Sequence, residues 1–186
     1  MEVIPSRPSQ AGDSAAAGAR SWSGWTGDPR ARPLTVIGWL LVASGCAHAI
    51  VWAVDGGAWE GAVTWRKPIL FGISGGLTAV SLGWAWSTLA RRRGDVAAAW
   101  ITAVSLAIEV LLIDLQRWRG VASHFNRTTR LDSLLYDLMG LLILVVTLVA
   151  VDLSIRSLWR RPEALHAGER VLPSDMLLAM QSGLWL

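Results

Sequence analysis

The sequence predicts an all-α fold: a polytopic transmembrane helix bundle of four spans, followed by a short C-terminal helix that is interfacial or truncated. Three observations predict this class. Hydrophobic residues make up 53% of the 186 residues, and the mean hydropathy is +0.42. The apolar residues gather in runs of about twenty, the length that crosses about 30 Å of hydrocarbon as a helix. The arginines cluster at the ends of these runs, as the loops of membrane proteins require.

The chain length predicts one domain with two flanking segments. Residues 1–33 are rich in Ser, Ala, Gly, Pro and Arg and lack an apolar period, so we expect a disordered cytoplasmic tail. Residues 34–155 form the four-helix transmembrane domain. Residues 156–186 form a cytoplasmic segment, in which the apolar run from Met176 is too short to span a bilayer. That run predicts an interfacial helix or the start of a fifth span.

The four spans are predicted at residues 34–54, 68–89, 96–115 and 134–153. A signal peptide competes with the first span, because Ala43 to Cys46 loosely resembles a lipoprotein cleavage box. The apolar run continues well past Cys46, which favours a span. The second span starts at Pro68, and proline suits a first helical turn. Gly72 and Gly76 in this span have small-xxx-small spacing, which predicts a close helix contact and a face for a homo- or hetero-oligomer.

The distribution of basic residues predicts the orientation. Eleven lie in the two terminal segments and the 91–93 loop, and six lie in the other two loops. The positive-inside rule therefore places both termini in the cytoplasm. Only one of the 17 basic residues is lysine, a bias that with the richness in Ala and Gly indicates a GC-rich bacterium and its cytoplasmic membrane. These loop arginines also account for the pI near 10, so we expect the lipid bilayer and not nucleic acid as the partner.

The polar stretch from Glu109 to Gly140 is the most unusual part of the sequence, because it sets charged and amide side chains beside apolar runs. Intramembrane ionisable residues are functional candidates by default. In the predicted topology the polar residues of all four spans lie in the outer half of the membrane, where one pocket could collect them. The candidate ligand-binding residues are His48, Lys67, Ser74, Glu109, Gln116, Arg119, Ser123, His124, Asn126, Asp132 and Tyr136.

Several of these residues also have structural explanations. Glu109 fits a buried ion pair with an arginine or lysine equally well, and a lone His48 is more often a hydrogen-bonded core histidine. Asp132 is placed to cap the fourth helix. Asp114 and Arg117 are three residues apart on another face of the third span, where they could pair with each other. The single cysteine, Cys46, excludes an internal disulfide and any multi-cysteine metal site.

Two motifs carry a resemblance. The run Trp65-Arg66-Lys67-Pro68 with Phe71 and Ser74 is followed by Gln116-x-x-Arg119-Gly120-x-x-Ser123-His124-Phe125-Asn126-x-x-Thr129-x-x-Asp132 and by Tyr136-x-x-Met139-Gly140. This pattern, over about Leu34 to Leu186, resembles a group of uncharacterised bacterial multi-pass membrane proteins. The resemblance implies no reaction. It implies that the chain of such proteins continues into a further span, and so a truncated or short version here.

Three functions remain open from the sequence. The first is a membrane protein whose outward-facing pocket binds an anionic or polar ligand, a lipid headgroup or an ion, with Lys67 and Arg119 attracting the anion and Glu109 compensating charge. The second is a membrane-embedded metal-dependent hydrolase or haem protein, for which only His48 and His124 would be available as ligands. The third is a structural helix-packing subunit. No cofactor is identified from the sequence.

Overall fold

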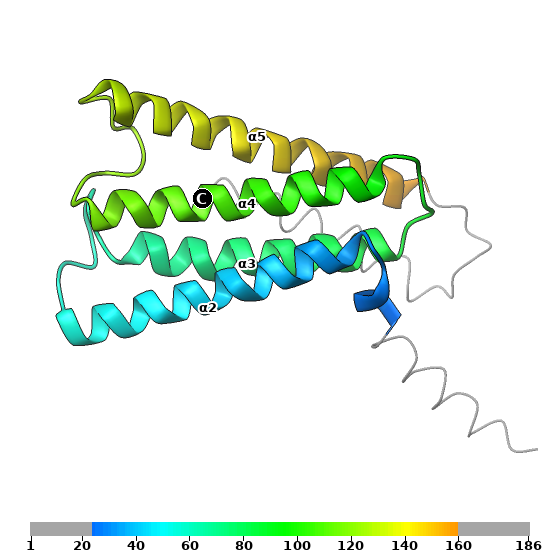
Figure 1. Cartoon of the computed structure of the whole chain (residues 1–186), viewed down its shortest axis with the longest axis horizontal. Helices are drawn as coiled ribbons and strands as arrows, with labels where there is room; N and C mark the ends of the chain where they lie inside the picture. Colours follow the sequence, from blue (N-terminus) through cyan, green and yellow to red (C-terminus); the bar gives the residue numbers. More distant parts are fainter. Residues whose placement is uncertain (1–23, 160–186) are drawn as a thin grey trace, which may run out of the picture.

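Four long α-helices make up the computed structural model, which describes residues 24–159 (Figure 1). A short 3-10 helix, η1 (Trp25–Gly27), precedes α2 (Ala31–Asp55), α3 (Arg66–Ser87), α4 (Asp95–Trp118) and α5 (Arg130–Leu158). Each of the four α-helices is long and apolar enough to cross a membrane, and the described residues contain no strand. The predicted all-α, multi-pass architecture is confirmed. The predicted C-terminal apolar helix lies outside the described residues.

The helices extend beyond the predicted apolar spans at most ends. Only α3 is shorter than predicted at one end, since it stops at Ser87, and many of the extra residues elsewhere are polar or charged. The predicted disordered tail is wrong for residues 24–33, which form η1, a turn and the start of α2. This segment is ordered because buried Arg30 bonds Asp28 and also reaches Asp95, which is 65 residues further along the chain.

The four helices run antiparallel in sequence order, so that α2 begins and α5 ends at the same end of the bundle (Figure 1). We call this end the Asp95 end. The opposite end, where α4 leads through residues 119–129 into α5, is the polar-loop end. The α2–α3 pair packs most extensively, and α5 lies against α4 with little contact to α3. The 119–129 segment therefore occupies the space where α5 diverges from the other helices (Figure 1).

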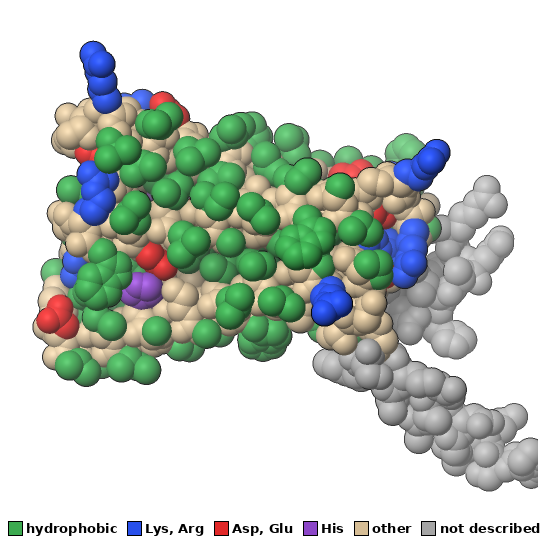
Figure 2. Space-filling model, viewed as in Figure 1, with side chains coloured by type: hydrophobic (Ala, Val, Ile, Leu, Met, Phe, Trp, Pro, Cys, Tyr) green, Lys and Arg blue, Asp and Glu red, His purple; other side chains and the backbone are tan. Residues whose placement is uncertain are grey.

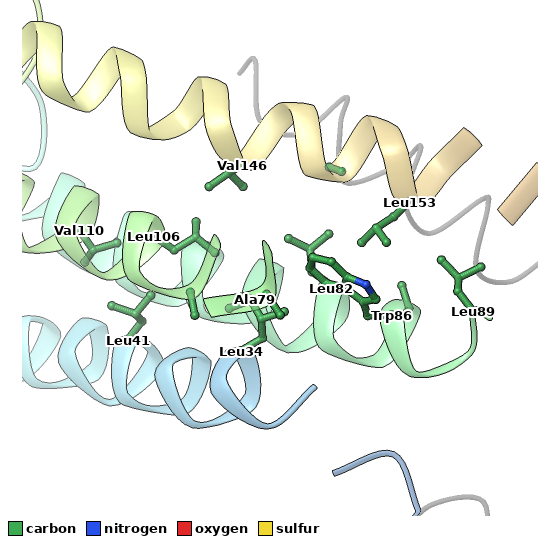
Figure 3. Packing of buried hydrophobic residues seen from close by; sticks show 14 residues of the cluster. Leu34, Leu41, Ala79, Leu82, Trp86, Leu89, Leu106, Val110, Val146 and Leu153 are labelled. Carbon is green, nitrogen blue, oxygen red and sulfur yellow. The ribbon is translucent and has the colours of Figure 1, made fainter. Parts of the chain in front are cut away.

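Apolar side chains from all four helices fill the interior (Figure 3). Leu34 and Leu41 of α2 meet Leu82 and Trp86 of α3, and α4 adds Leu106 on the same interior surface. From α5 only small or branched residues reach this cluster: Val146, Ala150 and Leu153. Because lipid tails are as apolar as these side chains, the gain here comes from close packing more than from transfer out of water.

Glycines bring α2 and α3 into backbone contact. A Cβ added at Gly76 would lie 2.5 Å from the Gly38 carbonyl oxygen, and one added at Gly72 would lie 2.8 Å from the Gly45 Cα. The predicted close helix contact is therefore present, and its partner is α2 of the same chain. Gly72 and Gly76 are thus packed against α2 of the same chain.

A buried ionic network closes the Asp95 end. The Asp95 carboxylate accepts hydrogen bonds from Arg156 of α5 at 3.0 Å and from Arg30 at 3.3 Å, and all three residues are buried. Arg30 donates to the Leu89 carbonyl and Arg156 to the Ala90 carbonyl, so the two guanidinium groups also satisfy the chain between α3 and α4. With its charges paired in this way, the network fixes the ends of α2, α4 and α5 to one another.

Candidate functional site

The predicted site residues lie mainly at the polar-loop end, in three separate groups and not in one pocket. The first group joins α4 to α5 around Asp132. The second lines a hollow beside Lys67. The third surrounds His48 between α2 and α4. Residues that the sequence placed on one wall are thus divided by the packing of the helices, and each group has its own chemistry.

The first group, the Asp132 clamp, contains Gln116, Arg119, Thr128, Thr129 and Asp132. One Asp132 oxygen accepts hydrogen bonds from the Arg119 guanidinium at 3.0 Å and the Gln116 amide at 3.3 Å. The other accepts from the Thr129 hydroxyl at 2.7 Å and the Thr128 hydroxyl at 3.2 Å. Arg119 also donates to the Gln116 side-chain oxygen. Asp132 and Gln116 are almost fully buried, so this carboxylate is saturated by protein donors.

The helix cap of α5 belongs to the same clamp. The N-cap residue is Thr129, whose hydroxyl oxygen accepts from the Asp132 backbone N–H at 3.1 Å. Asp132 is therefore the last residue of a T-x-x-D capping arrangement, at the third position of the helix, and not the cap itself. Asn126 supports the loop before it, accepting from the Thr128 backbone N–H and donating to the Ala122 carbonyl. The clamp is a structural joint, and Arg119 gives its Nη1 to this joint, where the buried Asp132 carboxylate offsets its charge.

The second group lines a shallow depression in the surface, open to the outside and not an enclosed cavity, which we call the hollow. The hollow is formed by the approach to α3, the last turns of α4 and the 119–129 segment. Its lining residues are Ala62, Val63, Thr64, Lys67, Ile113, Arg117, Val121 and Ser123. Two of these are cations and none is an acid, so the hollow has a positive field.

Donors in and beside this hollow lack acceptors. Among the described residues the Thr64 hydroxyl, the Trp65 indole nitrogen and the Arg117 Nε are buried without a hydrogen-bond partner. Lys67 is half-buried and has no ion pair or hydrogen bond within residues 24–159. Arg117 lies 3.9 Å above the centre of the Trp65 ring, a cation-π contact that holds its guanidinium at the edge of the hollow. Buried donors without acceptors cost free energy, and an anion would satisfy them.

His124 and Ser123 close one side of the hollow. The Ser123 hydroxyl and His124 Nδ1 are 2.9 Å apart, and the imidazole lies 5.5 Å from the Phe71 ring. His124 belongs to the connecting segment outside the helices. Burial lowers the pKa of His124 below its ordinary value of 6.5, and the nearby Lys67 charge lowers it further. His124 is thus held neutral by its surroundings at neutral pH.

The third group, the His48 cluster, consists of Ser44, His48, Asp114 and Trp118. The Trp118 indole N–H donates to His48 Nε2 at 3.2 Å, and His48 Nδ1 is 2.9 Å from the Ser44 carbonyl oxygen. Because an indole N–H can only donate, Nε2 is the acceptor and Nδ1 carries the ring proton toward Ser44. Both imidazole nitrogens are therefore engaged, which leaves no free lone pair on His48 for a metal or a haem.

Asp114 completes the His48 cluster from α4. Its Oδ2 accepts from the Ser44 hydroxyl at 3.2 Å and lies 4.0 Å from His48 Nδ1. Its Oδ1 is buried and has no hydrogen-bond partner among the described residues. Figure 2 shows a histidine directly beside an acidic side chain on the flank of the bundle, surrounded by hydrophobic side chains. The expected Asp114–Arg117 pair is wrong, because Arg117 turns to Trp65 and Asp114 to Ser44.

Glu109, Ser74 and Tyr136 join none of the three groups. Glu109 is 6% exposed and has no ion pair or hydrogen bond to any described residue, so the expected pairing with an arginine or lysine is absent from this part of the chain. It lies seven residues from Gln116 and fourteen from Asp95, both of which contact α5, and so occupies the α4 face that α5 covers. Ser74 is exposed on α3. The Tyr136 ring of α5 lies 5.5 Å from the Phe125 ring of the 119–129 segment.

Sequence reasoning missed Thr64, Arg117 and Asp114 as members of these groups. Their spacing in the sequence did not indicate a site. Thr64 precedes α3, and Asp114 and Arg117 were expected to form an ion pair with each other. The useful signal was the density of tryptophans near Trp65 and Trp118, whose rings are 5.0 Å apart; the Trp65 ring contacts both Arg117 and the His48 ring. Within residues 24–159 no three His, Cys, Asp or Glu side chains gather closely enough to hold a metal ion.

Comparison with known proteins adds no relative: no family model, curated protein or solved structure matches the chain.

Proposed function

We propose that this protein binds a tetrahedral oxyanion, a phosphate or sulfate group, in the hollow beside Lys67 at the outer end of a four-span bundle in a bacterial cytoplasmic membrane. The observation that carries the proposal is the convergence of unpaired donors on a surface without acids. Lys67 and Arg117 supply two positive charges, and the buried Thr64 hydroxyl and Arg117 Nε have no acceptor among the described residues. An oxyanion has enough lone pairs to accept from all of them.

The proposed orientation places the hollow outside the cell and both termini in the cytoplasm, as the positive-inside count favours. Trp52 and Trp59 stack with each other at the polar-loop end, and Trp118 is largely exposed there. Such indole rings are typical of the membrane interface, which supports a headgroup depth for Lys67 and Arg117. The oxyanion can therefore come from the outer solution or from the headgroup of an anionic lipid.

The anion-binding role moves from Arg119, the residue that the sequence favoured, to Arg117. Arg119 already shares Asp132 with three other donors, so an anion near it would have to compete with a buried carboxylate. Arg117 is one of the lining residues of the hollow, and its buried Nε has no hydrogen-bond partner among the described residues. Lys67 keeps the role that the sequence suggested, and Ser123 and His124 form the adjoining wall.

The test is ligand-induced stabilisation of the full chain in maltoside micelles, which contain no phosphate. Sulfate that occupies the site should raise the free energy of unfolding by about 2.7 kcal/mol at a hundred times its Kd. Lys67→Met should abolish this gain. Arg130→Met is the matched control, because Arg130 is an exposed arginine at the same end of the bundle and lies outside the lining of the hollow.

The two sources of the oxyanion are distinguished in the same assay. Sulfate also stabilises proteins generally by exclusion from their surface, an effect that Lys67→Met would retain and that must be subtracted. A Lys67-dependent gain with inorganic sulfate identifies a free anion as a ligand. A Lys67-dependent gain only with added phosphatidylglycerol identifies a lipid headgroup. Equal gains in the wild type and Lys67→Met with both additives would overturn the proposal.

A further inference from the structure

We infer that Asp114 is a proton-binding site whose protonation strengthens oxyanion binding in the neighbouring hollow. This inference rests on the proposed function, since it concerns how that site is regulated. It begins from two side chains on the same helix, Asp114 and Arg117. They are three residues apart and opposite in charge, yet each has a buried polar atom without a partner and they do not pair. Asp114 could thus take a proton or a hydrogen-bond donor, and Arg117 a hydrogen-bond acceptor, that residues 24–159 do not supply.

The atom that would take the proton is Asp114 Oδ1. Every other polar atom of the His48 cluster is engaged: Asp114 Oδ2 with the Ser44 hydroxyl, His48 Nδ1 with the Ser44 carbonyl, and His48 Nε2 with the Trp118 indole. Asp114 Oδ1 is buried and lacks a donor among the described residues. An ionised carboxylate that keeps one oxygen without a donor in such surroundings is costly, and a proton on Oδ1 removes that charge.

The coupling to the hollow follows from the arrangement of charges. Positions three apart on a helix are neighbours, so Asp114 lies within the field of Arg117. The Trp65 ring lies between the hollow and the His48 cluster. The Arg117 guanidinium is 3.9 Å from the centre of the Trp65 ring, and the centre of the His48 ring is 5.9 Å from the same point. With Asp114 ionised, its negative charge offsets part of the field that Lys67 and Arg117 direct at the anion. With Asp114 protonated, both positive charges act on the anion.

Proton and oxyanion binding therefore favour each other, and thermodynamic linkage makes the effect reciprocal. The other titratable or charged groups around Asp114 are His48 on α2, Lys67 at the start of α3, Glu109 and Arg117 on α4, and His124 in the connecting segment. Arginine and lysine keep their charges at neutral and mildly acidic pH. His124 and Glu109 need variants of their own to be separated from Asp114.

The experiment is calorimetric titration of the full-length protein in maltoside with sulfate, whose double charge is constant over the pH range used. Each titration is repeated in two buffers of different ionisation enthalpy, which gives the number of protons taken up. Near the midpoint of the Asp114 titration we expect net uptake of up to about half a proton per sulfate bound, the largest value that a tenfold coupling allows, and about tenfold tighter binding well below that midpoint than well above it, a coupling of ordinary size.

Asp114→Asn keeps the shape and the acceptor for Ser44 but cannot be protonated. It should bind sulfate with the tight, low-pH affinity throughout and take up no proton at Asp114. Glu109→Gln is the control and should leave the proton uptake in place, whereas His124→Gln removes only the uptake that His124 itself contributes beside the anion. Sulfate binding in the wild type without proton uptake overturns the inference and leaves the proposed function standing, as does uptake that persists in Asp114→Asn. Absence of sulfate binding in the wild type overturns both.

Discussion

The Asp95 carboxylate of α4 and the Arg156 guanidinium of α5 form a buried ion pair at 3.0 Å. Arg30 completes the network from the residue before α2. At the opposite end of the same two helices, Gln116 of α4 donates to Asp132 of α5. The α4–α5 interface is thus fastened by a buried polar joint at each end, and Glu109 lies between the joints on the same face of α4.

Removing the charge of Asp95 should destabilise the bundle strongly. In Asp95→Asn, Arg30 keeps its pair with Asp28 and Arg156 keeps only the exposed Asp152, so the two arginines lose their shared buried counter-charge, at a cost on the order of 3 kcal/mol. The control is Asp152→Asn, since Asp152 also pairs with Arg156 but its side chain is 53% exposed, and such pairs contribute about 1 kcal/mol or less. Unfolding of both variants by dodecyl sulfate in mixed micelles measures the difference. Equal losses would contradict the assignment of the network.

Adding one methyl group at the α2–α3 contact should also destabilise the bundle. In Gly76→Ala the new Cβ would lie 2.5 Å from the Gly38 carbonyl oxygen, so the two helices must separate, at a cost of about 1–3 kcal/mol. Gly140→Ala is the matched control, because a Cβ at Gly140 meets nothing within 4 Å and α5 gains helix propensity. The same unfolding assay decides the case. A loss in Gly140→Ala as large as that in Gly76→Ala would refute the packing argument.

The Thr129 hydroxyl should matter more than other threonine hydroxyls in the bundle. Thr129→Val removes both the cap on the Asp132 N–H and a 2.7 Å hydrogen bond to the Asp132 carboxylate, which should cost about 1–2 kcal/mol. Thr147→Val serves as the comparison, since Thr147 bonds only the carbonyl one turn before it in its own helix. Thermal unfolding that ranks Thr147→Val as the more damaging change would count against the clamp.

Glu109 should behave in the opposite way from Asp95 and Asp132. It is buried without a hydrogen-bond partner among the described residues, so Glu109→Met replaces an unsatisfied carboxyl with an apolar side chain of similar length. We expect the free energy of unfolding to stay constant or to rise by about 1 kcal/mol. A strong loss, comparable to that of Asp95→Asn, would mean that Glu109 has a partner. A stable Glu109→Met protein would show that the carboxyl is kept for a reason other than folding.

The stability of the folded protein should fall as the pH drops below the ordinary pKa of histidine. Burial, and then the Lys67 charge, lower the pKa of His124 in the folded state below 6.5, so the unfolded chain takes up a proton first. The loss begins near the unfolded pKa and levels off below the folded pKa. His124→Gln should remove this slope, and Lys67→Met should reduce it. Melting temperatures across the range from neutral to mildly acidic pH measure this pH dependence. An unchanged slope in His124→Gln would show that another group causes it.

The helices and their order could be predicted from the sequence because each depends on local composition. Apolar runs of about twenty residues fix the spans whatever their neighbours are, since an unpaired backbone cannot cross lipid. The Gly72 and Gly76 spacing likewise predicted a close helix contact, which the backbone approach of α2 provides. The identity of the partner helix was not contained in that spacing, because any helix with small residues could have filled the same face.

The candidate site depended on which side chains the packing brought together. Arg119 and Arg117 differ by two positions, and the sequence favoured Arg119, yet the fold gives Arg119 a buried carboxylate and leaves Arg117 beside the hollow. Asp114 seemed satisfied by a neighbour that in fact lies over Trp65. By itself the sequence determined that the chain forms four helices long and apolar enough to cross a membrane, with polar groups concentrated near their ends. Only the tertiary structure decided which of them are paired, because a hydrogen bond depends on distances of a few tenths of an ångström between helices that are far apart in the chain.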